Sequence, residues 1–132
     1  LIRPALARGA WVLCDRFSDA SYAYQGAGRG IPAEHIRALE TLVQQDLRPD
    51  LKLLLDAPVE VGLARARARR GRAGADRFGR EEIEFFQRVR ACFLDIARHE
   101  PQRVKLIDAD RTPEAVAADI EARVLALLPP TP

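Results

Sequence analysis

The chain has 132 residues, 48% of them hydrophobic, and its 21 basic and 19 acidic residues give a net charge of +2. This size and composition are typical of one globular domain, and the balanced charge is unlike the strongly basic surface of a nucleic-acid-binding protein. No apolar run reaches the length of a membrane span, and the two cysteines form neither a metal motif nor a disulfide framework. We therefore expect a cytoplasmic protein without a membrane or nucleic-acid partner.

The first 14 residues predict a helix followed by a strand. Residues 1–8 carry apolar side chains at helical spacing, and Gly9 suits the position just after a helix. The apolar run at 11–14 predicts a buried strand, with Cys14 as a buried thiol. Because the chain starts with leucine and has no methionine, we expect that Leu1 is not the translational start and that an N-terminal part precedes it.

The polar stretch after residue 14 is the strongest functional signal in the sequence. Asp15 and Arg16 stand where a strand is expected to end, and ligands of open α/β sheets bind at the carboxyl ends of strands. Arg16 offers a planar fork of donors that suits a phosphate. A short helix is predicted over 18–25, with Ser18 as its N-cap. Its side chains that could pack on or read a flat polar ring are Ser21, Tyr24 and Gln25. The alternative is a surface Asp–Arg pair followed by a turn.

The middle of the chain predicts a loop, a helix and a second strand. The glycine-rich residues 26–30 predict a loop, which is no P-loop because no Lys-Ser/Thr follows it. Residues 32–47 predict a helix that Pro49 ends. Its expected inward face consists of Ile36, Leu39, Leu42 and Val43. The nearly continuous apolar run at 51–56 predicts a strand of a parallel sheet covered on both faces.

Arginine dominates the segment between Leu63 and Arg80, which holds seven arginines and one acidic residue. Arg65 and Arg69 are four residues apart and therefore share a face of the helix predicted to begin at Pro58. Three interpretations are open: a solvated basic helix, a nucleic-acid-binding patch, and a mobile cover that closes over phosphates. The glycines of this segment favour the mobile cover.

The remaining residues complete an alternating pattern of strands and helices. Residues 81–100 predict a long amphipathic helix, and 104–108 predicts a third strand. Residues 113–128 predict the last helix, with Thr112 as its N-cap. This alternation indicates an α/β fold with a mostly parallel sheet. We expect one domain over 1–128, followed by a disordered tail at 129–132.

Short motifs in a fixed order resemble the thymidylate kinase family, the ATP-dependent dTMP kinases of bacteria, over essentially the whole chain. These motifs are Asp15-Arg16-Phe17, Ala23-Tyr24-Gln25-Gly26, Gly28-Arg29-Gly30, Pro49-Asp50-Leu51, Leu55-Asp56, the arginine run 62–69, Asp76-Arg77-Phe78 and Ile107-Asp108-Ala109. The resemblance implies the P-loop kinase fold, with the P-loop and the first two strands lying outside these residues. On this expectation the P-loop strand would lie between the strands at 11–14 and 51–55. The 132 residues alone would then be inactive and marginally stable at best.

The resemblance also implies roles on the acceptor side of the site. Asp15 and Arg16 would be catalytic residues: Asp15 would lie beside the acceptor phosphate and the Mg²⁺ shell, as an indirect metal contact, and Arg16 would hold the dTMP phosphate. Ser21 would lie near the thymine edge, and Tyr24 would pack on the deoxyribose. Gln25, the next residue, would also contact the substrate.

On the donor side, the resemblance implies an arginine-rich lid at about 65–77. Arg69 would be the catalytic arginine, and Arg65 would also bind ATP. The loop that begins with Asp108 and Ala109 would receive the adenine, whereas Phe78 would bind the substrate by closing over the nucleoside.

The expected reaction is therefore the transfer of a phosphoryl group from ATP, with Mg²⁺, to dTMP in dTTP biosynthesis, by a homodimer as in relatives. One alternative is a kinase of another nucleoside or nucleoside monophosphate. The other is a non-catalytic nucleic-acid-binding module that uses the arginine-rich segment 65–80.

Overall fold

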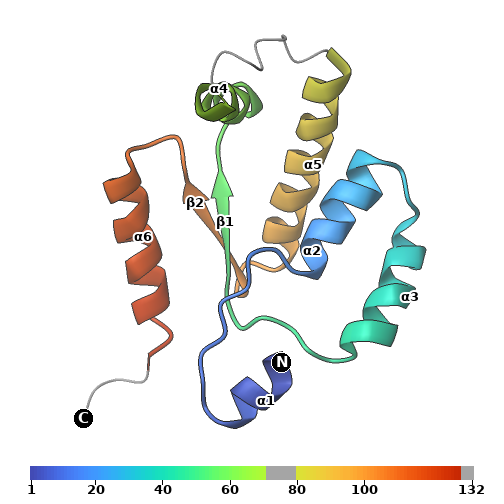
Figure 1. The fold of residues 1–132 in the computed structure, drawn as a ribbon, viewed down its shortest axis with the longest axis vertical. Coiled ribbons are helices and arrows are strands. Elements are labelled where there is room, and N and C mark those ends of the chain that lie inside the picture. The colour runs from blue at the N-terminus through green and yellow to red at the C-terminus, as the bar shows by residue number, and fades with distance from the viewer. Residues whose placement is uncertain (71–79, 129–132) are drawn as a thin grey trace.

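The structure is a computed structural model that describes residues 1–70 and 80–128 (Figure 1). In chain order its elements are α1 (Ile2–Ala7), α2 (Ser18–Ser21), the π-helix η1 (Tyr22–Gly28), α3 (Ala33–Gln44), β1 (Lys52–Asp56), α4 (Val59–Arg70), α5 (Arg80–His99), β2 (Val104–Asp108) and α6 (Pro113–Leu125). The predicted tail at 129–132 lies outside the described residues.

The two strands form a parallel pair, with Lys52 opposite Val104 and Asp56 opposite Asp108. Helix α5 covers one face of this pair and α6 lies against the other (Figure 1). The core consists of Ala23, Ile36, Val89, Val104 and Ile107, and α6 contributes no buried residue to it. The predicted parallel α/β arrangement is therefore confirmed for the strands at 51–56 and 104–108.

Two of the predicted helix ends form as expected. The Thr112 hydroxyl accepts a hydrogen bond of 3.3 Å from the backbone N–H of Ala115, which caps α6, and Pro113 occupies the first turn. Gly9 follows α1 with a φ of +75°, a conformation that glycine adopts without steric cost.

The predicted strand at 11–14 does not form. Trp11 and Leu13 are 66% and 99% exposed, and the Cys14 thiol is exposed instead of buried. A strand needs hydrogen bonds from a neighbour. In the described part of the chain, β1 and β2 pair only with each other. Among the residues that the structure describes, no strand lies beside this apolar run, so its backbone stays unpaired.

Helix α3 ends earlier than predicted and buries less. It ends at Gln44, because Gln45 has a φ of +58° and leaves the helix well before Pro49. Of the predicted inward face, only Ile36 is buried. The other three residues of that face are 62–77% exposed: Leu39, Leu42 and Val43. The helical spacing was right, but most of this face has no packing partner among the described residues.

The helix predicted over 18–25 extends into the predicted glycine loop. Ser18 is its first helical residue and not its N-cap, and no side chain caps this end. The π-helix η1 continues to Gly28, where an added Cβ would lie 2.5 Å from a ring carbon of Phe85. Arg88 of α5 donates to the backbone oxygens of Ala27 and Gly28 at 3.3 and 3.1 Å. Close packing and these bonds hold the glycines in helical conformation.

The surface of the chain is large for its mass. It exposes 9986 Å², whereas a compact monomer of 14.7 kDa would expose about 6,900 Å². Exposed apolar side chains of the 11–14 segment and of α3 contribute to this surface. Among the described residues, no helix is both long and apolar enough to span a bilayer.

Candidate active site

Arg16, the predicted phosphate ligand, has a backbone φ of +68°. Only a few per cent of non-glycine residues adopt this left-handed region, and such strain of about 1 kcal/mol is concentrated at functional sites. The guanidinium carbon lies 4.4 Å from the centre of the Tyr24 ring, and Nη2 donates to the Tyr24 hydroxyl at 3.0 Å. The structure thus joins these two predicted site residues.

Tyr24 is in turn held by aromatic side chains of α5. Its ring centre lies 6.2 Å from that of Phe85 and 6.1 Å from that of Phe93, in tilted and edge-on geometries that aromatic pairs favour. Lys52 Nζ lies 4.8 Å from the centre of the Phe93 ring, which adds a cation–π contact to this cluster. Because Tyr24 is half-buried and Arg16 is exposed, the cluster presents the guanidinium to solvent.

The other predicted acceptor residues lie nearby in the chain but are not joined to Arg16. Asp15 and Ser21 are exposed, and Gln25 is half-buried on η1. Within the described residues, no side-chain hydrogen bond connects any of these three to Arg16 or Tyr24.

On the donor side, Arg65 of α4 contacts the loop after β2. Its Nη1 donates to the Ala109 carbonyl at 2.7 Å, and its Nη2 lies 3.5 Å from a carboxylate oxygen of Asp110. The Asp108 carboxylate accepts the Asp110 backbone N–H at 2.9 Å, which fixes the loop. Arg65, Asp108 and Ala109, all predicted for ATP binding, therefore share one small region.

Of the two remaining predicted site residues, the structure describes Arg69 but not Phe78. Arg69 is exposed one helical turn beyond Arg65. Phe78 lies outside the described residues, as does most of the predicted lid at 65–77, of which only 65–70 is seen, as the end of α4.

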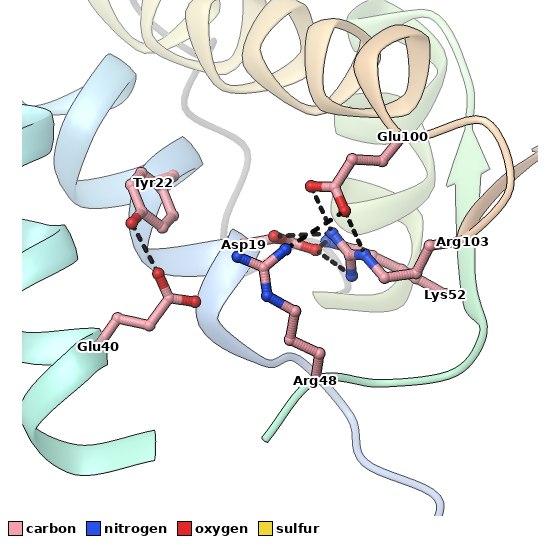
Figure 2. Close-up of polar contacts among 7 residues, drawn as sticks. All are labelled: Asp19, Tyr22, Glu40, Arg48, Lys52, Glu100 and Arg103. Atoms are coloured by element: carbon pink, nitrogen blue, oxygen red, sulfur yellow. Dashed lines mark hydrogen bonds and ion pairs between the residues drawn. The ribbon is translucent and has the colours of Figure 1, made fainter. Parts of the chain in front are cut away.

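A cluster of charged side chains that the sequence did not predict connects α2 to the two strands (Figure 2). Asp19 accepts hydrogen bonds from Lys52 at 2.7 Å and from Arg103 at 3.1 Å, and Arg103 also binds Glu100 at 2.7 Å. Burial alone would raise the pKa of Asp19, but the bonds from Lys52 and Arg103 outweigh it and leave that pKa below its usual value. Asp19 is the one buried charged residue in the described chain.

The only signal that could have revealed this cluster is Lys52. It is one of two lysines in the sequence, and it opens an otherwise apolar strand. A second missed contact, also drawn in Figure 2, joins η1 to α3: the Tyr22 hydroxyl donates to Glu40 at 2.7 Å. Partial burial and this contact with the carboxylate raise the pKa of Tyr22.

A third missed pair lies where β1 ends. Asp56 accepts two bonds from Arg90 of α5, from Nε at 2.6 Å and from Nη2 at 2.8 Å. The hydrogen bond to the carboxylate raises the pKa of Arg90, so the guanidinium stays charged. This parallel, two-bond geometry is the strongest form of an arginine–carboxylate contact.

The described residues contain no group of three or more His, Cys, Asp or Glu side chains that could hold a metal by themselves. Mg²⁺ commonly takes one or two carboxylates, with its other positions filled by waters and substrate phosphates. The exposed carboxylate of Asp15 fits that kind of site, in which the nucleotide supplies most of the ligands.

The parallel strands and their flanking helices form a partial α/β fold, and its similarity to a solved structure identifies the class as the P-loop kinase fold. The crystal structure of thymidylate kinase from Ehrlichia chaffeensis is similar, with a TM-score of 0.70 and 28% identity. The match covers 94% of this chain and 57% of that one.

The comparison of sequences narrows the class to a family. The model of the thymidylate kinase family matches residues 1–120, and the chain belongs to this family. It is 59% identical over 128 residues to a thymidylate kinase of Pseudomonas putida strain W619 and 56% identical over 128 residues to one of Methylococcus capsulatus. Each match covers 97% of this chain and 60% of the relative, so the chain spans about 60% of the length of these relatives. The resemblance and the fold class predicted from the sequence are thus confirmed.

Proposed function

We propose that the protein phosphorylates dTMP to dTDP with ATP, in the cytoplasm and as a step of dTTP biosynthesis. The observation that carries this proposal is the exposed guanidinium of Arg16, held over Tyr24 in a chain of the thymidylate kinase family. A fixed guanidinium can take two oxygens of a phosphate at once, and the aromatic ring beneath it offers a surface for a sugar.

The residues of the two sides would divide the work of phosphoryl transfer. This reaction needs alignment of donor and acceptor and positive charge on the moving group, and little covalent help. Arg16, Ser21, Tyr24 and Gln25 would hold and orient dTMP, with Asp15 beside its phosphate. Mg²⁺, carried by ATP, would neutralise charge on the donor phosphates, and the Asp15 carboxylate could approach its water shell.

On the donor side, Arg65, Asp108 and Ala109 would contact ATP, and Arg69 would supply charge to the transferred phosphoryl group. We propose that Phe78 binds the substrate dTMP by covering its nucleoside. The 132 residues contain no Gly-x-x-x-x-Gly-Lys-Ser/Thr motif. Within this proposal these residues therefore supply the acceptor side and part of the donor side of the active site. We propose that the full-length protein is a homodimer.

An assay of ADP release by the complete natural gene product tests the proposal. With ATP and Mg²⁺, we expect faster turnover of dTMP than of dCMP, dGMP or thymidine. Faster turnover of any of these three would instead favour the related kinase with another acceptor. The nucleic-acid alternative predicts binding to duplex DNA that weakens steeply with salt, and such binding without kinase activity would overturn the proposal.

Two variants test the carrying observation. Arg16→Lys removes the planar fork and the stacking contact while it keeps the charge, and we expect KM for dTMP to rise about tenfold or more, as the loss of a charged hydrogen bond implies. Tyr24→Phe removes only the 3.0 Å bond to Arg16 and should have a smaller effect in the same direction. The matched control is Arg98→Lys at an exposed position of α5, which should leave KM unchanged. Equal KM values for the Arg16 and Arg98 variants would contradict the assignment.

A further inference from the structure

The two groups of site residues lie on different elements and have no direct bond between them in the described chain. The acceptor group, Arg16 and Tyr24, rests on aromatic side chains of α5. The donor group, Arg65 and Ala109, lies between α4 and the loop after β2. Phosphoryl transfer requires the attacking and leaving oxygens to lie roughly in line, and a misplacement of about 1 Å can cost on the order of 100-fold in rate. Some contact must therefore fix the distance between the two groups.

The pair Asp56–Arg90 lies between them. Arg90 is on α5, five residues after Phe85 and three before Phe93, the two rings that hold Tyr24. Asp56 is the last residue of β1, and its carboxylate receives both bonds of the Arg90 guanidinium, at 2.6 and 2.8 Å. The side chains are 18% and 39% exposed for Asp56 and Arg90, so water screens this pair only in part.

Asp56 also reaches the donor group through its main chain. Its carbonyl oxygen accepts the Ala109 N–H at 2.7 Å, and the carbonyl of Ala109 in turn accepts the bond from Arg65. A continuous line of contacts thus runs from Tyr24 through α5 and the Arg90–Asp56 pair to Ala109 and Arg65. The pair is the link in this line that joins α5 to the end of the strand.

We propose that Asp56 and Arg90 are a positioning pair that fixes the spacing between the acceptor and donor groups. This inference rests on the proposed function. Neither side chain is assigned a contact with substrate. A two-bond guanidinium–carboxylate contact has a defined length and orientation, which a longer acid or a lysine does not reproduce. Each group of site residues keeps its own contacts when the pair is broken, so binding should survive while alignment is lost.

The test compares kcat with binding in the complete natural protein. For Asp56→Asn and Arg90→Lys we expect kcat to fall on the order of 10- to 100-fold, the size of effect that small misplacements of reacting groups produce. The dissociation constants of dTMP and of a non-hydrolysable ATP analogue, measured by calorimetry, should change less than about twofold, because no binding contact is removed. Asp56→Glu keeps the charge but lengthens the contact by one methylene, and it should lose kcat as well.

A double variant and a matched control make the test sharper. If the two residues act as one unit, Asp56→Asn combined with Arg90→Lys loses no more kcat than the worse single variant. Glu100→Gln serves as the control, because it breaks a partly buried ion pair that lies just beyond the C-terminal end of the same helix. We expect its kcat to stay within about twofold of the wild type.

The outcomes separate this inference from the proposed function. A wild-type protein that does not phosphorylate dTMP overturns the proposed function. An active wild type in which Asp56→Asn and Glu100→Gln behave alike overturns the inference alone. Full kcat in Asp56→Glu, or a loss that appears in the binding of dTMP rather than in kcat, also overturns it.

Discussion

The strand pair and the segment before α2 contain similar apolar runs, but these runs differ in how deeply their side chains are buried. In β2, Val104 and Ile107 are 3% and 1% exposed, whereas Leu13 of the 11–14 segment is 99% exposed. Val104 and Ile107 are buried because β1 and β2 supply each other's hydrogen bonds and helices lie against both faces of the pair, although Leu55 and Leu106 of the same strands stay about half exposed. Apolar character alone does not bury a segment. It also needs a neighbour for its backbone and a layer for its side chains.

The largest test of this comparison removes one apolar side chain from each region. Ile107→Ala should lower the free energy of unfolding by about 3 kcal/mol, through lost burial and a residual cavity. Leu13→Ala should change it by less than about 0.5 kcal/mol, because this side chain has no packing to lose. Urea unfolding followed by circular dichroism measures both. A loss at Leu13 as large as that at Ile107 would show that the 11–14 segment is packed in solution.

A second test concerns the buried charge that fastens the N-terminal region to the strands. Asp19→Asn leaves Lys52 and Arg103 without their shared carboxylate, and we expect a loss of about 3 kcal/mol of stability at pH 7. The control is Asp46→Asn, which removes an exposed pair with Arg3 and should leave the unfolding midpoint unchanged. Similar midpoints for the two variants would mean that the Asp19 cluster does not hold the two regions together.

The same cluster predicts a pH dependence. The folded-state pKa of Asp19 is lowered below its ordinary value of 3.8, so its stabilising effect is present above pH 3.8 and is lost as the pH falls through the folded value. The stability difference between wild type and Asp19→Asn should therefore be constant near neutral pH and shrink in acid. A difference that grows as the pH falls below 3.8 would have the wrong sign.

A third test compares two glycines, one at the junction of the regions and one on an exposed helix. At Gly28 an added methyl would meet the Phe85 ring at 2.5 Å, so Gly28→Ala should cost about 2 kcal/mol. At Gly62 of α4 an added Cβ would meet no atom within 4 Å beyond its chain neighbours and the backbone of its own helix, and Gly62→Ala should stabilise the protein by about 0.5–1 kcal/mol. Thermal unfolding measures both, and a stabilising Gly28→Ala would show that η1 can move away from α5.

The smallest expected effect separates a formed helix cap from one that failed to form. Thr112→Ala removes the side-chain acceptor of the Ala115 N–H and should cost about 1 kcal/mol. Ser18→Ala removes no cap bond, since Ser18 lies inside α2, and should be neutral within about 0.5 kcal/mol. Equal losses in chemical unfolding would indicate that Ser18 caps α2 in solution after all.

The elements that the sequence predicted best are those with a strong local pattern of apolar residues. The strands at 51–56 and 104–108 and the helix at 81–100 were found within a residue or two of their ends. Their apolar patterns are strong, and the chain returns from one strand to the other through a single crossover.

The Asp19 cluster could not be predicted in the same way. Its partners are 33 and 84 positions away from Asp19 in the chain, and each is a charged residue of a type that usually lies on the surface. The contact between Arg16 and Tyr24 is different, because the family motifs named both residues, while their stacking depends on a left-handed backbone that no pattern reveals.

The exposed 11–14 segment carries the only tryptophan of the chain, Trp11. Its fluorescence therefore reports on this one segment without any label. As the structure stands, with the indole 66% exposed, emission should be red-shifted and easily quenched by iodide or acrylamide. Any partner that paired with these residues would carry the indole out of water, and its arrival could be followed in real time as a blue shift of a single spectral band.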